Sequence, residues 1–206
     1  MSEDKRILLD IWSDYVCPFC FLAEFPLHEA IRGKDVEVTW MPFELRPYPT
    51  PTLKPKGNYL QNAWRDSVYP IAARMGIDIR LPTVSPQPYT RLAFEGLEFA
   101  KERGLADANN SAVMQSFFQQ SLDIGNLDVL ATIAKDIGLD PADFREALEA
   151  GKYSERHQQL LRHAYEQVGV TGVPLFAIGN RTLSGLQSKE TLIAAIDQEL
   201  RSQQSS

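Results

Sequence analysis

The stretch that decides the fold is Ile7-Leu8-Leu9-Asp10-Ile11-Trp12-Ser13-Asp14-Tyr15-Val16-Cys17-Pro18-Phe19-Cys20. Its first half, up to Trp12, has the β-branched and aromatic character of a buried strand. From Cys20 onward apolar residues recur at helical spacing until Gly33, which predicts a helix over residues 17–32, kinked at Pro26. Residues 36–40 then alternate as a second strand, so we predict a β-α-β unit with parallel strands.

The remainder of the chain is helical in its middle and regains strand character near its end. Prolines cluster at residues 42–55 and 82–88 and mark linkers. Periodic apolar residues and capping signals predict helices over residues 59–75, 89–103, 108–122, 127–138, 141–150, 153–168 and 189–200, before a polar tail. Residues 173–178 and 181–183 flank the turn signal Gly179-Asn180 and predict a hairpin. The outline is β-α-β, a helical insertion, then α-β-β-α.

Composition narrows the class of protein. The chain has 206 residues, of which 44% are hydrophobic and 23% charged, as is usual for a folded globular protein. Its formal net charge is −6, and no basic stripe is present, which disfavours nucleic-acid and membrane partners. The start Met1 to Arg6 lacks the positive region of a signal peptide, and we expect a cytoplasmic protein. The sequence does not specify an oligomeric state.

Cys17 and Cys20 are the only cysteines and lie where the first strand passes into the first helix. Positions i and i+3 of a helical turn are close enough for a disulfide to open and close with little backbone movement. The helix N-terminus favours a thiolate on the leading cysteine, and Pro18 suits a first turn. We therefore predict Cys17 as an exposed nucleophile and Cys20 as a buried resolving thiol. Pro18-Phe19 offers no polar group to stabilise the thiolate, so we expect the Cys17–Cys20 pair to be less oxidising than the strongest dithiol oxidants.

A metal site is the main alternative to redox chemistry at the two cysteines. A zinc site would need two more ligands, and His157 and His163 lie far along the chain on one predicted helix, so no metal is expected. We interpret both histidines as solvated, and His28 as a core or surface residue. Asp10 and Asp14 flank the motif, either as a strand-end charge and a turn residue or as a buried acceptor for the Cys20 proton.

Aromatic side chains near the motif have two readings as well. Trp12, Tyr15 and Phe19 are interpreted as an apolar rim around the sulfurs, although core packing accounts for Trp12 equally well. Phe117 and Phe118 are interpreted as core of the insertion. No glycine-rich nucleotide signature is present, so neither a flavin nor a nicotinamide is expected.

Four stretches together resemble the DsbA-like branch of the thioredoxin superfamily, and most closely its FrnE-like cytoplasmic oxidoreductases: residues 13–20, 42–47, 123–126 and 169–176. The resemblance implies an α/β thioredoxin-like fold with an all-helical insertion domain, divided as 1–55, 56–150 and 151–206. It also implies a cis bond between Val173 and Pro174, facing the sulfurs. Those two residues, with Pro18 and Phe19, are then the candidate substrate-binding residues.

The function predicted from these features is thiol-disulfide exchange on a protein or small molecule. The cofactor would be the redox-active disulfide itself, with glutathione as a possible thiol partner. Two rivals stay open: a glutathione-dependent isomerase or transferase resembling 2-hydroxychromene-2-carboxylate isomerase and the kappa-class transferases, and a client-binding chaperone module. The isomerases need no second cysteine, so Cys20 favours redox work. The direction of exchange, whether oxidation, reduction or isomerisation, is left open.

Overall fold

The computed structural model describes residues 6–204. Residues 1–5 and 205–206 lie outside the described part. The expectation that the start of the chain is not a signal peptide concerns mostly residues 1–5. The strands are β1 (Ile7–Ser13), β2 (Val36–Pro42), β3 (Leu175–Ile178) and β4 (Arg181–Ser184). The helices are α1 (Pro18–Ile31), α2 (Asn58–Ala63), α3 (Tyr69–Met75), α4 (Arg91–Lys101), α5 (Ala106–Phe118), α6 (Leu127–Asp136), α7 (Pro141–Glu149), α8 (Ser154–Arg162) and α9 (Lys189–Gln204), with π-helical segments η1 (Trp64–Val68) and η2 (His163–Val168).

The strands form a sheet in the order β2-β1-β3-β4. β1 runs parallel to β2, with Ile7 opposite Val36, and antiparallel to β3, which pairs antiparallel with β4. The predicted β-α-β unit and the predicted hairpin are thus both confirmed. β1 lies in the interior of the sheet and ends at Ser13, immediately before the cysteine motif.

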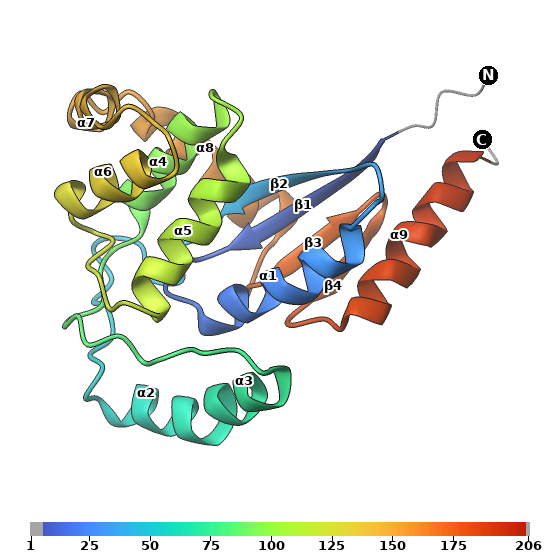
Figure 1. The fold of residues 1–206 in the computed structure, drawn as a ribbon, viewed down its shortest axis with the longest axis horizontal. Helices are drawn as coiled ribbons and strands as arrows, with labels where there is room; N and C mark the ends of the chain where they lie inside the picture. The colour runs from blue at the N-terminus through green and yellow to red at the C-terminus, as the bar shows by residue number, and fades with distance from the viewer. Residues whose placement is uncertain (1–5, 205–206) are drawn as a thin grey trace.

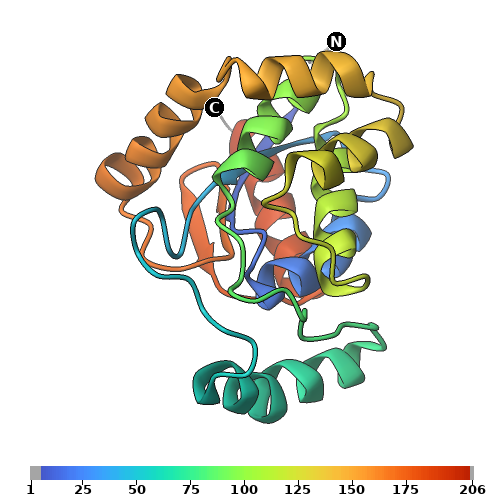
Figure 2. The same ribbon diagram turned by 90° about the vertical axis from the view of Figure 1, so that its left-hand side faces the viewer.

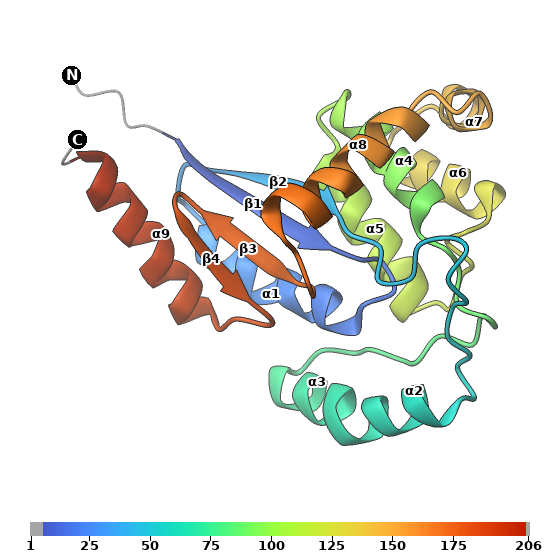
Figure 3. The same ribbon diagram turned by 180° about the vertical axis from the view of Figure 1, so that it is seen from behind.

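Helices cover both faces of this sheet. α1 and α9 pack against each other on one face, in front of the sheet in Figure 1. α8 lies across the opposite face and contacts β2, as the view from behind shows (Figure 3). α1 runs without interruption from Pro18 to Ile31, and Pro26 lies inside it. This three-layer arrangement is the thioredoxin-like fold that the sequence predicts, and it leaves the N-terminus of α1 at the C-terminal end of β1.

The segment between β2 and β3 is helical, as predicted. Its core is built from aromatic rings, each at most 2% exposed: Phe94, Phe99, Phe117, Phe118 and Phe144. α2, η1 and α3 follow one another without a break, so residues 58–75 form one long helix. Figure 2 shows this helix in teal at the lower edge of the molecule, reached through two extended loops. The predicted domain limits at residues 55/56 and 150/151 stay a prediction.

Element ends differ from prediction in two instructive places. β3 begins at Leu175, two residues later than predicted, and the preceding Val173–Pro174 bond, which is cis, belongs to a loop. α9 runs to Gln204 instead of stopping near Leu200, and side-chain bonds such as Gln203 Nε2 to Glu199 Oε1 (3.0 Å) support its last turn. Its predicted cap is confirmed, since Ser188 Oγ accepts from Thr191 N at 3.1 Å. No helix within the described residues is both long and apolar enough to cross a membrane.

Candidate active site

Cys17 is the residue that caps α1 at its N-terminus. Its backbone is extended (φ −89°, ψ 111°), and its carbonyl accepts from the N–H groups of Cys20 (3.1 Å) and Phe21 (3.3 Å). Pro18 occupies the first turn of the helix, where a missing N–H leaves no partner unsatisfied. The leading sulfur therefore sits at the end of the helix where free N–H groups and the helix dipole stabilise negative charge.

Cys20 lies one turn further along α1 and is 1% exposed, as predicted for a buried thiol. Both cysteines are free thiols in the structure. Burial raises the pKa of Cys20 well above its ordinary value, and hydrogen bonding with the neighbouring Cys17 thiol raises it further. The backbone of Asp14 and the hydroxyl of Ser13 lower it by smaller amounts. Cys20 thus holds its proton at neutral pH and needs an acceptor before it can attack.

The predicted exposure of Cys17 is wrong in degree. The residue is only 6% exposed, because the helix Asn58–Met75 and the loops on either side of it wall off the sulfur. Cys17 instead lines a cavity of about 270 Å³. The sulfur is therefore reached through a pocket and not across an open surface.

The loop before β3 passes directly over Cys17. The Val173–Pro174 bond is cis, as the resemblance implied, and the Cys17 thiol donates a long hydrogen bond to the Val173 carbonyl oxygen (3.6 Å). Val173 is half-buried and Pro174 buried. β3 pairs on both sides, so an edge-strand role does not explain this proline. A backbone carbonyl beside the sulfur offers a contact point for an extended substrate chain.

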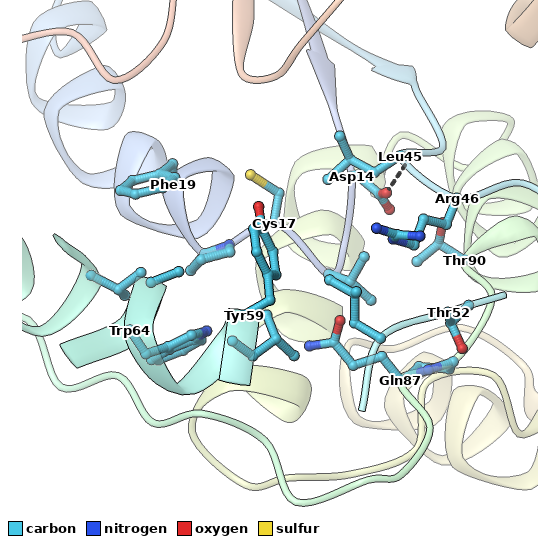
Figure 4. Close-up of a pocket in the computed structure, with 17 residues that line it drawn as sticks. Asp14, Cys17, Phe19, Leu45, Arg46, Thr52, Tyr59, Trp64, Gln87 and Thr90 are labelled. Carbon is cyan, nitrogen blue, oxygen red and sulfur yellow. Dashed lines mark hydrogen bonds between the residues drawn. The ribbon is translucent and has the colours of Figure 1, made fainter. Parts of the chain in front are cut away.

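The cavity beside Cys17 has four walls, which Figure 4 shows in close-up. One wall is the start of α1, with Pro18 and Phe19. The long helix 58–75 faces it, and the loops after β2 and before α4 close the remaining sides. Further lining residues are Asp14, Val16, Leu45, Arg46, Thr52, Leu53, Tyr59, Leu60, Ala63, Trp64, Val68, Gln87, Pro88 and Thr90.

The predicted aromatic rim is correct only for Phe19. Tyr15 is fully buried and packs on Phe94, with ring centroids 4.6 Å apart. Trp12 is 3% exposed and belongs to a small core cluster with Phe43. The aromatic side chains that do line the cavity, besides Phe19, come from the helix 58–75. Sequence reasoning missed these aromatic side chains. The only signal for them was their place in the first helix after a proline-rich linker.

Asp14 is buried, at 1% exposure, and lines the same cavity as Cys17. Its Oδ2 accepts from Leu45 N at 2.8 Å, while Oδ1 has no hydrogen-bond partner within residues 6–204. Burial raises the pKa of Asp14 to about 7, a hydrogen bond from Thr90 lowers it, and the charge of Glu44 raises it. Asp14 is therefore a buried carboxylate, and it is also a turn residue, because its carbonyl accepts from Cys17 N at 3.0 Å.

Asp10 has neither of the roles considered for it. It lies in the middle of β1, where it pairs with Thr39 of β2 and Ala177 of β3, so it is not a strand-end residue and does not line the cavity. Only one of the two flanking acids therefore reaches the thiol site.

The histidines divide into two kinds. His28 is partly exposed and bonded to Asp107 (3.3 Å), whose carboxylate raises its pKa, and His163 is also partly exposed and bonded to Gln167 (2.7 Å). The solvated reading of His157 is wrong: it is 1% exposed, and its Nε2 bonds the carboxylate of Glu44, itself 4% exposed, at 2.7 Å. Throughout the described chain, no three His, Cys, Asp or Glu side chains gather closely enough to hold a metal ion.

The sequence is similar to known proteins over almost its whole length. It is 47% identical over 192 residues to the uncharacterized protein YwbO of Bacillus subtilis, covering 93% of this chain and 96% of that protein. The structure is similar to that of the probable DsbA oxidoreductase SCO1869 of Streptomyces coelicolor, with a TM-score of 0.78 and 26% identity over 94% of this chain and 90% of that one.

A more distant solved structure shares the fold. The cytosolic disulfide reductase DsbM of Pseudomonas aeruginosa, solved with GSH, has a TM-score of 0.69 and 19% identity over 96% of this chain and 98% of its own. The family described as DSBA-like thioredoxin domain matches residues 8–197 of the sequence, a range that includes both cysteines, the buried Asp14 and the cis-proline loop. The chain therefore belongs to the DSBA-like thioredoxin domain family of thiol-disulfide oxidoreductases.

Proposed function

We propose that this protein exchanges thiols and disulfides through the Cys17–Cys20 pair, with Cys17 as the nucleophile and Cys20 as the resolving thiol. The observation that carries the proposal is the position of the Cys17 sulfur, at the N-terminus of α1, beside the Val173 carbonyl and on the wall of a cavity. Cys20 lies behind it, buried and protonated. This asymmetry supports one attacking and one resolving sulfur.

In the reductive direction the reaction has two steps. The Cys17 thiolate attacks one sulfur of a substrate disulfide, forms a mixed disulfide and releases the other sulfur as a thiolate, which takes a proton. Cys20 then loses its proton and attacks the Cys17 sulfur, which releases the second substrate thiol and forms the Cys17–Cys20 disulfide. The substrate gains two electrons that the dithiol loses. The reverse sequence oxidises a substrate dithiol.

Asp14 is proposed as the acceptor of the Cys20 proton. A carboxyl with a pKa of about 7 is roughly half ionised at neutral pH, so it can take a proton in one step and return it to solvent in another. Asp14 also lines the cavity through which the proton would leave. Its unpaired Oδ1 supports this role, because a proton on that oxygen displaces no existing hydrogen bond within the described residues.

The cavity supports a small substrate or a single side chain of a larger one. Its volume of about 270 Å³ lies just below the usual range of small-molecule sites, roughly 300–1,000 Å³. Its lining combines apolar side chains with the guanidinium of Arg46, which would suit a thiol that carries a carboxylate. Glutathione fits this description and is our proposed partner thiol. The DsbM structure with GSH and the motifs shared with FrnE-like proteins support placing this activity in the cytoplasm.

The test is trapping of the mixed disulfide. Purified Cys20→Ser protein is mixed with oxidised glutathione or a disulfide-bonded peptide, and the adduct is located by mass spectrometry of tryptic peptides. We expect the substrate on Cys17 in Cys20→Ser, no adduct in Cys17→Ser, and turnover of insulin reduction in the unaltered protein alone. Adduct formation at equal rates on both cysteines would overturn the assignment of roles.

The rival functions predict other outcomes in the same experiments. A glutathione-dependent isomerase or transferase would keep its activity on a glutathione conjugate in Cys17→Ser and would not reduce insulin. A client-binding chaperone would suppress aggregation of an unfolded client equally well after replacement of both cysteines by alanine. The buried, protonated Cys20 one turn behind Cys17 favours redox exchange over both.

A further inference from the structure

A buried carboxylate and a buried histidine meet behind the thiol site. Glu44 follows β2 and is 4% exposed, and His157 lies in α8 and is 1% exposed. Their side chains join at 2.7 Å between Oε1 and Nε2, across 113 positions of sequence. The mechanism above uses neither residue, although buried charged groups of this kind are retained only where they are paired and positioned.

Two bonds from one helical stretch fix Glu44 in place. His157 in α8 holds its side chain, and the hydroxyl of Tyr165, in the continuing segment η2, donates to its backbone carbonyl at 2.6 Å. The His157 ring is itself immobilised against Phe94, with ring centroids 5.7 Å apart and planes at 12°. The backbone at Glu44 is therefore clamped from the face of the sheet opposite α1.

The other side of this clamped segment touches the active site. The next residue, Leu45, donates its backbone N–H to Asp14 Oδ2 at 2.8 Å. Glu44 also acts on Asp14 through space, since its negative charge raises the pKa of the Asp14 carboxyl. Asp14 lines the Cys17 cavity, so a continuous path of contacts leads from His157 through Glu44 and Leu45 to the thiol site.

We propose that the Glu44–His157 pair is a positioning element of the thiol site, which holds the Leu45 N–H on Asp14 and fixes the Glu44 carboxylate where its charge acts on the Asp14 carboxyl. Its consequence for the reaction rests on the proposed role of Asp14 as proton acceptor. Glu44 and His157 touch neither sulfur and are not catalytic residues.

Other charged or titratable groups lie around Asp14 and the pair. They are Cys17 and Cys20 on α1, Tyr15 after β1, Arg46 in the loop after β2, Tyr165 in η2, and Arg91 on α4. Arg46 is exposed and donates to the Pro51 carbonyl (3.1 Å), and Arg91 is bonded to Glu95 (2.9 Å). Glu44 is the charged carboxylate that acts on Asp14 from within the protein core.

The test separates the charge of Glu44 from its hydrogen bond. Glu44→Gln keeps an oxygen that accepts from His157 but removes the negative charge. The titration of Asp14 is followed by carboxyl-carbon NMR, with the signal assigned by its loss in Asp14→Asn. We expect Glu44→Gln to lower the Asp14 midpoint by about one unit, because a nearby like charge disfavours the ionised form. An unchanged midpoint in a folded variant would overturn the proposal.

A matched control and a second variant complete the design. Glu95→Gln changes another buried carboxylate, 1% exposed, but Glu95 lies in α4 and bonds Arg91 and Ser154, so the Asp14 midpoint should stay where it is. His157→Leu removes the bond that holds the Glu44 carboxylate in place, so the charge is no longer fixed near Asp14 and the Asp14 midpoint should fall, as in Glu44→Gln. If Glu44→Gln does not fold, His157→Leu decides the question, and a midpoint equal to that of the unaltered protein counts against the proposal.

Failure of the proposed function would be visible separately. The NMR midpoint needs no substrate, so it reports on the pair even if the cysteines do no exchange. Resolution is measured as the rate at which Cys20 displaces a thiol from a preformed Cys17 mixed disulfide, over a range of pH. If Asp14→Asn leaves this rate unchanged, the role of Asp14 is wrong while the midpoint result stands. If both hold, Glu44→Gln should shift the pH profile of resolution by the same amount as the midpoint.

Discussion

Replacing Asp14 by asparagine should make the protein more stable at alkaline pH while slowing its chemistry. In the folded state burial raises the pKa of Asp14 from 3.8 to about 7. Because the folded protein holds this proton to higher pH than the unfolded chain does, ionisation of Asp14 opposes folding. The penalty is absent below the unfolded pKa of 3.8 and complete above the folded value. Asparagine removes it and keeps an oxygen for the Leu45 N–H.

The size of the effect follows from the two pKa values. Each unit of difference corresponds to about 1.4 kcal/mol, so the penalty reaches about 4 kcal/mol at about pH 8. At about pH 5 most folded molecules carry a protonated Asp14, and the same arithmetic leaves about 2 kcal/mol. The gain in the free energy of unfolding on Asp14→Asn should therefore be about 2 kcal/mol larger at about pH 8 than at about pH 5.

This difference in the free energy of unfolding between Asp14→Asn and the unaltered protein, called the gap below, is measured by urea unfolding across the pH range. Unfolding is followed by circular dichroism, with a phosphine reductant to keep both thiols reduced. Asp78→Asn is the control, because the Asp78 side chain is 65% exposed and its surface ion pair with Arg80 contributes little to the free energy of unfolding. A gap for Asp14→Asn that is equal at both ends of the range would refute the reasoning, since it would mean that Asp14 ionises as freely in the folded protein as in the unfolded chain.

Two further variants test the substrate pocket and the insertion. Arg46→Ala should raise KM for oxidised glutathione about fivefold and leave kcat unchanged, since an exposed charge contact is worth about 1 kcal/mol. Steady-state kinetics with an uncharged disulfide is the comparison, because its KM should not change. An equal rise in KM for both substrates would count against a carboxylate contact. Asn126→Ala removes the side chain that accepts from Asp128 N (2.8 Å) at the start of α6, and it should lower the free energy of unfolding in urea by about 1 kcal/mol. Thr132→Ala, within the same helix, keeps this cap. An equal loss of stability in Thr132→Ala would show that the cap contributes little.

Much of the fold follows from local patterns that act over a few residues. Ile7, Leu9 and Ile11 alternate toward the core at 0–1% exposure, and the Gly179–Asn180 turn fixes the pairing of the strands around it. The start of α7 was equally readable, because Asp140 caps the helix with bonds from Ala142 N and Asp143 N. Such signals need no knowledge of distant parts of the chain.

The site depends on contacts that local patterns do not contain. The turn at Asp14 could be predicted locally, but its burial and its hydrogen bonds from Leu45 and Thr90 depend on separate loops. His157 stands among Glu155, Arg156, Gln158 and Gln159 and therefore looks solvated, yet its face of α8 turns toward Glu44. Only the packing of α8 across the sheet brings these two residues together. The position of the dithiol was predictable because strand, turn and helix are consecutive there.

The helix Asn58–Met75 has a consequence for how proteins of this design can diversify. It forms one wall of the cavity beside Cys17, but it is joined to the rest of the chain by two proline-containing connections and contributes no strand to the sheet. One wall of the cavity can therefore change independently of the segment that carries the two cysteines. Exchanging this single helix for that of a relative should alter the shape of the cavity, while Cys17, Cys20 and Asp14 stay as they are.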